Sequence, residues 1–150
     1  MKRPIVIGLG NPDRGDDAAG RVVAQILKSR GARGYDVVEA RGEATEILAL
    51  FEGRENVTLI DACVSGAPAG ALHQLDMQSQ RAPDKGGETS SHGTGLAEAI
   101  ELARALGLLP RHCLVYAIEA ASFEQGATMT PAVADATNRL VDQILARLHD

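Results

Sequence analysis

The chain has 150 residues, which fits one domain with a hydrophobic core of its own. It carries 15 Lys and Arg against 20 Asp and Glu, a net charge of −5, and only 3% aromatic residues with no Trp. These values argue against binding to a nucleic-acid backbone or stacking on bases. The hydrophobic fraction of 45% excludes a disordered chain, and two cysteines cannot form a disulfide framework.

The apolar run near the N-terminus is short. It extends from Ile5 to Leu9 and ends at the turn residues Asn11–Arg14. Such a run cannot serve as a signal peptide or cross a membrane. We therefore expect a cytoplasmic protein of one domain (1–150), monomeric, with neither a membrane nor a nucleic acid as partner.

Strand-like and helix-like patterns alternate along the chain. Short apolar, β-branched runs predict strands buried on both faces, namely Pro4–Leu9, Val37–Val38, Val57–Ala62 and Cys113–Ile118. Apolar residues at helical spacing predict helices, namely Ala19–Leu27, Ala44–Phe51, Leu96–Ala103 and a last one opened by Thr130-Pro131. Gly31 and Gly107 are expected to end the first and third helices.

Turn residues from Ser65 to Gly70 precede Ala71–Leu75, which we expect to return as an antiparallel strand beside the third predicted strand, Val57–Ala62. The stretch Gln78–Ser91 has almost no apolar side chains and is predicted to be a long loop, either a surface excursion or a lid. The alternation predicts an α/β fold, a mostly parallel sheet with helices on both faces. In such sheets the ligand site lies at the carboxyl ends of the strands.

The turn after the first strand resembles a dinucleotide-binding turn, because Gly8-x-Gly10 lies between a strand and a helix. The third glycine of that fingerprint would fall at Asp13, and further acidic residues crowd the start of the helix where a pyrophosphate should bind. Two like unit charges about 4 Å apart repel each other by about 1 kcal/mol in water and about 4 kcal/mol near a protein surface. We reject the dinucleotide interpretation.

Asp16 and Asp17 are adjacent at the predicted start of the first helix. Helix capping explains one short carboxylate there but not two. We assign the cap to Asp16 and expect Asp17 to point into the crevice.

Asp61 closes the apolar run Val57–Ile60, where a lone carboxylate needs a partner. A buried structural hydrogen bond would satisfy it, but we favour a role as a ligand or general base. Cys63 alternates onto the same strand face and is assigned to the core.

His92 has only small neighbours in Ser90–Gly95, which keep its imidazole accessible just before a helix. The other histidines, His73, His112 and His149, have no such setting and are assigned structural or solvated roles. Nearby serines, at positions 65, 90 and 91, lie in no nucleophile elbow, which argues against a serine mechanism.

Asp17, Asp61 and His92 would form a nitrogen and oxygen ligand set suited to a borderline divalent cation such as nickel or zinc. A cation would also offset the repulsion between the two carboxylates. Three protein ligands leave coordination positions open for substrate or water.

The chain resembles the hydrogenase maturation endopeptidases over nearly its whole length. The resemblance rests on motifs in the right order, namely Gly8-Leu9-Gly10-Asn11 with Asp16-Asp17 and Gly20, Leu59-Ile60-Asp61-Ala62, Ser91-His92-Gly93, and Gly126 with Thr130-Pro131-x-Val133. It implies a twisted five-stranded sheet between helices and a protease that removes a C-terminal extension from the large subunit of nickel–iron hydrogenases. It also implies that Asp17, Asp61 and His92 bind nickel that arrives with the precursor.

This sequence departs from the family pattern in two places. Ala18 stands where a glycine often follows the paired acids, and Arg41–Ala44 replaces a Gly-Gly-Thr-like segment. The second departure leaves the identity of the hydrogenase open. The opening Gly8–Pro12 is also similar to the peptidyl-tRNA hydrolases, but no early His follows and the net charge is negative, so this is a distant alternative.

Two further alternatives stay open. A nickel-binding or precursor-binding chaperone without catalytic activity would use the same three ligands. A metal-independent hydrolase would act without His92. The expected function is a nickel-dependent endopeptidase in which Asp61, or else Asp17, acts as the general base on a water molecule.

Overall fold

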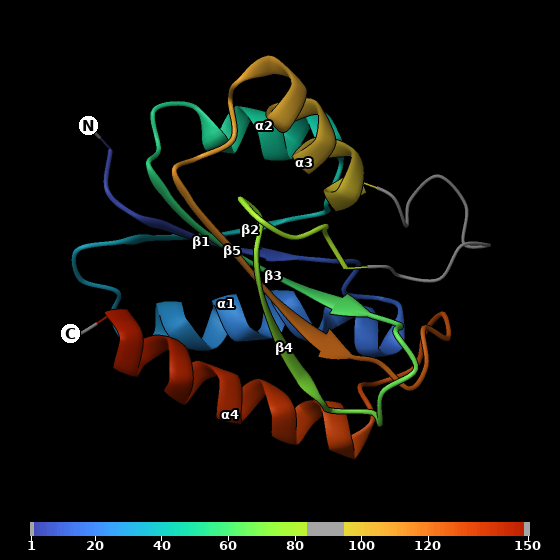
Figure 1. Ribbon diagram of the computed structural model, residues 1–150. Helices are drawn as coiled ribbons and strands as arrows, with labels where there is room; N and C mark the ends of the chain where they lie inside the picture. The colour runs from blue at the N-terminus through green and yellow to red at the C-terminus, as the bar shows by residue number, and fades with distance from the viewer. Residues whose placement is uncertain (1, 84–94, 149–150) are drawn as a thin grey trace.

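The computed structural model describes residues 2–83 and 95–148 and shows three layers, helix, sheet and helix (Figure 1). In chain order the elements are β1 (Ile5–Leu9), the 3-10 helix η1 (Gly15–Ala18), α1 (Ala19–Ser29), β2 (Asp36–Ala40), α2 (Ala44–Phe51), β3 (Asn56–Cys63), β4 (Leu72–Asp76), α3 (Gly95–Leu106), β5 (His112–Glu119) and α4 (Pro131–Leu148). The predicted α/β class is confirmed, because the sheet has five strands with helices on both faces.

The strands lie in the order β2-β1-β3-β5-β4. The strands β2, β1, β3 and β5 run parallel to one another. β4 pairs antiparallel with β5, and His73 lies opposite Ala117. The predicted antiparallel strand is therefore confirmed, but its expected place beside β3 is wrong, because β5 lies between β3 and β4. The chain passes from β1 to β2 on one side and then crosses to β3 on the other, so the topological switch point lies between β1 and β3. Ligands bind at this point in open α/β sheets.

Side chains that alternate along each strand fill two separate cores, one on each face of the sheet. Ile5, Ile7 and Leu9 of β1 pack with α2 and α3, whereas Val6 and Ile60 pack with α1 and α4. Both faces of β3 are buried, which explains its continuous apolar run. Asp61 and Cys63 continue the alternation of Val57 and Leu59 along β3, so they lie on the same face of the sheet, the one covered by α2 and α3.

The ends of the helices follow the expected turn chemistry. Gly107 has a φ of +71°, a left-handed conformation that ends α3 without a steric penalty, as predicted. Only the first part of the predicted loop Gln78–Ser91, up to residue 83, lies within the described residues, so its interpretation as a lid stays a prediction.

Candidate active site

The turn after β1 brings η1 against the end of the strand. Gly10 has a φ of +132°, and its N–H donates to the carbonyl of Ala40 at 3.2 Å. A Cβ atom at Gly10 would lie 1.9 Å from the carbonyl oxygen of Asp17. Only glycine therefore allows Asp17 to approach the chain so closely.

Asp17 closes this turn with its carboxylate. Its Oδ2 accepts the backbone N–H of Asn11 at 2.9 Å, and the residue is only 8% exposed. This hydrogen bond fixes one oxygen of Asp17 beside the carboxyl end of β1, at the switch point of the sheet.

The predicted capping role of Asp16 is wrong. Arg14 precedes η1 and Ala18 precedes α1, and no side chain caps either helix. Asp16 is fully buried and accepts the backbone N–H groups of Ala121, Ser122 and Thr130 at 2.8, 3.1 and 2.8 Å. It also accepts the Thr130 hydroxyl at 3.0 Å. Asp16 therefore fastens η1 to the segment between β5 and α4, and local capping rules miss it because these partners lie more than a hundred residues along the chain.

Asp61 lies near the end of β3, opposite Ala117 of β5, and is 4% exposed. Its Oδ1 accepts the N–H of Ala62 at 2.9 Å, which turns the carboxylate toward the carboxyl end of the strand. The first turn of α1 packs directly on this end, because a Cβ atom at Gly20 would lie 2.3 Å from the carbonyl oxygen of Ile60. The segments that carry Asp17 and Asp61 thus meet at one edge of the sheet.

His92 lies outside the described residues, so its predicted place in the site stays a prediction. The described chain resumes at Gly95, the first residue of α3. A Cβ atom at Gly95 would lie 1.8 Å from the carbonyl oxygen of Gly42, which follows β2. α3 therefore begins in tight backbone contact with the loop beyond the carboxyl end of β2.

Glu119, the last residue of β5, is a buried carboxylate that the sequence analysis missed. It accepts the N–H and the hydroxyl of Ser65 at 2.8 and 2.5 Å, and it contacts Cys63 Sγ at 3.5 Å and His73 Nε2 at 3.1 Å. The sequence carries the same signal here as at Asp61, a carboxylate that closes an apolar run. The predicted strand ended one residue earlier, at Ile118, and so left Glu119 out.

The surroundings of Glu119 hold it in the charged form. Burial by itself raises the pKa of this carboxyl, but hydrogen bonds from Ser65, then from His73 and Cys63, outweigh burial and lower its pKa to about 2. His73 and Cys63, assigned to solvated or core positions from the sequence, both contact this group. The side chain of His73 is 32% exposed, so it connects the buried carboxylate with solvent.

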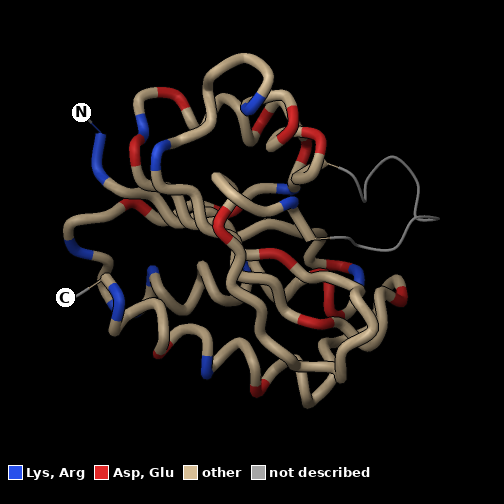
Figure 2. The backbone as a smooth tube through the Cα atoms, in the orientation of Figure 1, with Lys and Arg blue, Asp and Glu red and all other residues tan. Residues whose placement is uncertain are grey.

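Acidic residues gather at this edge of the sheet, where β3 and β5 end (Figure 2). Asp16, Asp17, Asp61 and Glu119 are all buried here, although acidic residues almost always lie at the surface. Asp16 and Glu119 are engaged in dense hydrogen bonding within the protein. Asp17 and Asp61 remain the candidates for chemistry, because both lie at the switch point.

Comparison with known proteins decides the family. Residues 21–147 match the HycI family model, described as hydrogenase maturation protease. The chain belongs to this family. The match includes Asp61 and position 92 and begins just after Asp17. The protein is therefore a protease of the hydrogenase maturation family, as the motifs predicted.

Individual relatives agree with this assignment. The hydrogenase 2 maturation protease of Escherichia coli (strain K12) is 23% identical over 99% of this chain and 92% of its own. The structure of the maturating endopeptidase HybD from E. coli has a TM-score of 0.80, with 22% identity over 99% of this chain and 93% of that one. HybD from Thermococcus kodakarensis has a TM-score of 0.76, with 23% identity over 99% and 100% of the two chains. This maturation protease thus shares their fold along its length.

Within the described residues of this protease, no helix is both long and apolar enough to cross a membrane.

Proposed function

We propose that this maturation protease removes the C-terminal extension of a nickel–iron hydrogenase large-subunit precursor after nickel has been inserted. The proposal rests on the family assignment and on one structural observation. The segments that carry the buried carboxylates Asp17 and Asp61 meet at the switch point between β1 and β3, where such folds bind ligands.

In this proposal Asp17, Asp61 and His92 bind the nickel that the precursor carries. Two carboxylates and an imidazole suit a borderline divalent ion, and three protein ligands leave positions for the substrate. The contact of Gly95 with Gly42 supports the participation of His92, because it holds the start of α3, three residues further along the chain, beside the loop that follows β2. In this scheme the nickel is part of the substrate, so these residues need not hold nickel before the precursor binds.

Two hydrogen bonds orient the two carboxylates in advance. The N–H of Asn11 holds one oxygen of Asp17, and the N–H of Ala62 holds one oxygen of Asp61. Asp61 is the proposed general base that takes a proton from the attacking water, with Asp17 as the alternative. Substrate-borne nickel would polarise the scissile carbonyl or lower the pKa of a bound water.

The proposed reaction takes place in the cytoplasm, with the hydrogenase precursor as partner and the monomer as the active form. The net charge of −5 supports a protein partner rather than a nucleic acid.

The test is incubation of a nickel-loaded precursor with the wild-type protein and with Asp17→Asn, Asp61→Asn and His92→Ala. Mass spectrometry of the precursor reports loss of its C-terminal extension. Asp142→Asn is the matched control, because Asp142 lies on α4 with a side chain that is 73% exposed. We expect cleavage by the wild type and by the control, and loss of at least about a hundredfold in rate with each site variant, the scale of general acid–base catalysis.

The outcomes separate the alternatives. Binding of the precursor without any mass change would support a chaperone instead of a protease acting on this precursor. Unchanged cleavage by His92→Ala would support a metal-independent hydrolase. Equal cleavage by the wild type and Asp61→Asn would remove Asp61 from the mechanism.

A further inference from the structure

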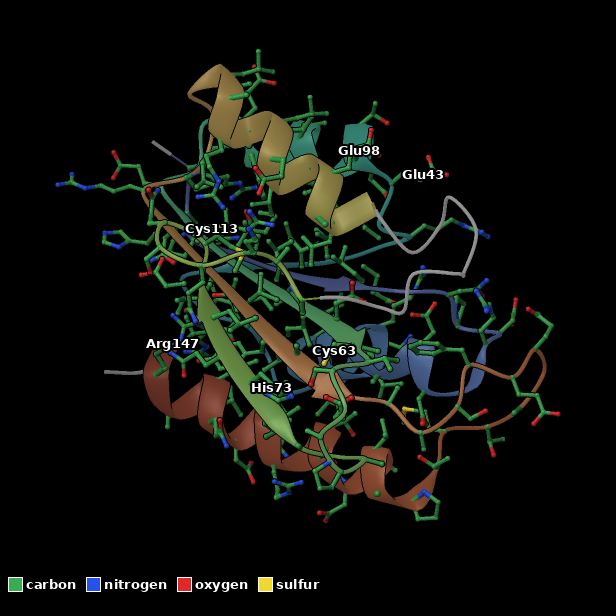
Figure 3. The ribbon with its side chains drawn as sticks, turned by 45° about the vertical axis from the view of Figure 1, so that its right-hand side comes forward. Glu43, Cys63, His73, Glu98, Cys113 and Arg147 are labelled. Atoms are coloured by element: carbon green, nitrogen blue, oxygen red, sulfur yellow. The ribbon has the colours of Figure 1, made fainter. Side chains whose placement is uncertain are left out.

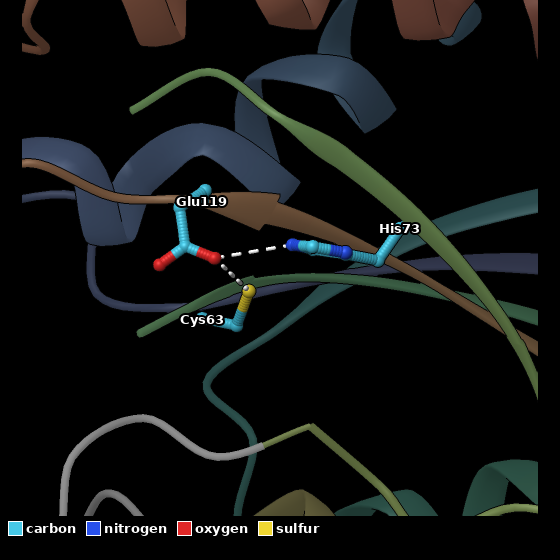
Figure 4. A group of neighbouring side chains, drawn as sticks. All are labelled: Cys63, His73 and Glu119. Atoms are coloured by element: carbon cyan, nitrogen blue, oxygen red, sulfur yellow. Dashed lines mark hydrogen bonds and ion pairs between the residues drawn. The ribbon is translucent and has the colours of Figure 1, made fainter. Parts of the chain in front are cut away.

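Cys63, His73 and Glu119 form a side-chain cluster, which we call the Cys63–His73–Glu119 cluster. The three residues come from β3, β4 and β5, which are adjacent strands at one side of the sheet. Figure 3 labels Cys63 and His73 on these strands, and Figure 4 shows all three side chains. One potential ligand atom from each lies within 4.8 Å of the other two. The proposed protease mechanism assigns no role to any of these side chains.

The distances within the cluster fit the first coordination shell of a zinc ion. Zinc binds sulfur at about 2.3 Å and nitrogen or oxygen at about 2.0 Å, so a tetrahedral site separates sulfur from oxygen by about 3.5 Å and nitrogen from oxygen by about 3.3 Å. Glu119 Oε1 lies 3.5 Å from Cys63 Sγ and 3.1 Å from His73 Nε2 (Figure 4). Cys63 Sγ and His73 Nε2 lie within 4.8 Å of each other, so this pair needs to close by at most about 1.3 Å to share one ion.

The surroundings favour a cation as well. Cys63 and Glu119 are each 1% exposed, and a thiolate and a carboxylate together balance the two positive charges of the ion in this buried place. Ser65 donates its N–H to the second carboxylate oxygen, Oε2, at 2.8 Å, which is the outer-shell contact that orients a ligating carboxylate. The partly exposed His73 gives the ion a route from solvent.

The geometry is less suited to a cysteine nucleophile. In a catalytic triad the histidine lies between the nucleophile and the acid. Here the carboxylate of Glu119 contacts both the thiol and the imidazole, so it occupies the centre of the cluster (Figure 4).

We propose that Cys63, His73 and Glu119 form a zinc-binding site beside the active site of this protease. Zinc binding displaces the thiol proton of Cys63 to solvent and forms a bond from the metal to the thiolate sulfur. The imidazole of His73 gives up the Nε2 proton that it shares with Glu119, binds zinc through the Nε2 lone pair and carries its remaining proton on Nδ1. The fourth position is left for water or a protein ligand. Cys63 and Asp61 are two residues apart on one face of β3, so this site is a close neighbour of the two carboxylates.

The experiment is a metal titration of the intact protein after removal of metals with a chelator. Cobalt(II) replaces zinc as the spectroscopic probe, because a thiolate ligand gives a charge-transfer band in the near ultraviolet. The chain has two cysteines, and Cys113 lies toward the other end of the sheet, away from the cluster (Figure 3). Cys113→Ser is therefore the matched control for Cys63→Ser.

We expect the cobalt band in the wild type and in Cys113→Ser, its loss in Cys63→Ser, and its displacement by added zinc. His73→Gln removes a direct ligand, so it should weaken zinc binding by at least about tenfold, the least that loss of even an outer-shell partner costs. Circular dichroism confirms that each variant is folded, and His73→Gln on the edge strand provides a second test if Cys63→Ser does not fold.

Absence of the band in the wild type, its persistence in Cys63→Ser, or unchanged zinc affinity in His73→Gln would overturn the proposal. Asp61→Asn should keep the band, and its loss there would show instead that the thiol belongs to a site shared with Asp61. Because the readout is metal binding and not cleavage, failure of the zinc site leaves the proposed protease function untouched.

Discussion

Replacement of Asp16 by alanine tests whether this buried carboxylate holds the site together. The wild-type carboxylate accepts three backbone N–H groups, from Ala121, Ser122 and Thr130, and a hydroxyl. The alanine variant leaves these donors without their acceptor, and each N–H that loses a partner in the interior costs about 1–3 kcal/mol. Water can reach some of them, because these donors are only partly buried. We expect Asp16→Ala to lower the free energy of unfolding by about 3–5 kcal/mol, near the lower bound of that sum.

The assay is urea unfolding followed by circular dichroism. With a slope of about 2 kcal/mol per molar urea, the midpoint should fall by about 2 M. Asp13→Ala, an exposed aspartate in the same turn, is the control and should stay within about 0.5 kcal/mol of the wild type. Asp16→Asn should fall between the two, because its amide oxygen can still accept. A loss below about 1 kcal/mol in Asp16→Ala, or an equal loss in Asp13→Ala, would refute the anchoring role.

Three further predictions concern other buried positions. Gly20→Ala should destabilise the protein by about 1–3 kcal/mol in thermal denaturation, because the added Cβ would lie 2.3 Å from the carbonyl oxygen of Ile60; an unchanged melting temperature would contradict this packing. Burial, with a contribution from a nearby aspartate, raises the pKa of Cys113 to about 12, so iodoacetamide at about pH 8 should label this thiol in urea but not in the folded protein, as mass spectrometry would show. The pKa of Glu119 is lowered to about 2, so its stabilisation is complete above the ordinary pKa of 4.5 and is lost as the pH falls toward 2. Urea midpoints should therefore fall more steeply with acidification in the wild type than in Glu119→Gln, and parallel curves would contradict the assignment.

The sequence predicts the strands well, because a run buried on both faces of a parallel sheet has a composition that surface segments lack. Val57–Ala62 and Cys113–Ile118 each fall one or two residues short of the observed strands β3 and β5. That small error at the end of β5 removed Glu119 from consideration. The turn residues before β4 predict that the chain returns antiparallel. They also place β4 beside β3, which is wrong, because its true partner β5 follows only later in the chain.

The candidate site is predictable only in part. Asp17 and Asp61 fall at the expected edge because the carboxyl ends of parallel strands share one side of a sheet. The cap assignment of Asp16 is wrong because the rule for helix starts considers only neighbouring residues. It does not take into account the distant segment 121–130, which supplies the hydrogen-bond donors of Asp16. His73 and Cys63 were assigned separately, and only the pairing of β3, β4 and β5 brings them to one carboxylate.

The long-range bonds of Asp16 have a consequence during synthesis on the ribosome. Asp17, Asp61 and His92 have all been translated well before Thr130, yet the turn that carries Asp17 is secured only when Thr130 and its neighbours emerge. A nascent chain of about 120 residues therefore holds every proposed nickel ligand without the clamp that fixes the first of them, and contacts so distant in sequence form late because closing a long loop is entropically costly. The enzyme should gain competence only after residues 121–130 have left the exit tunnel.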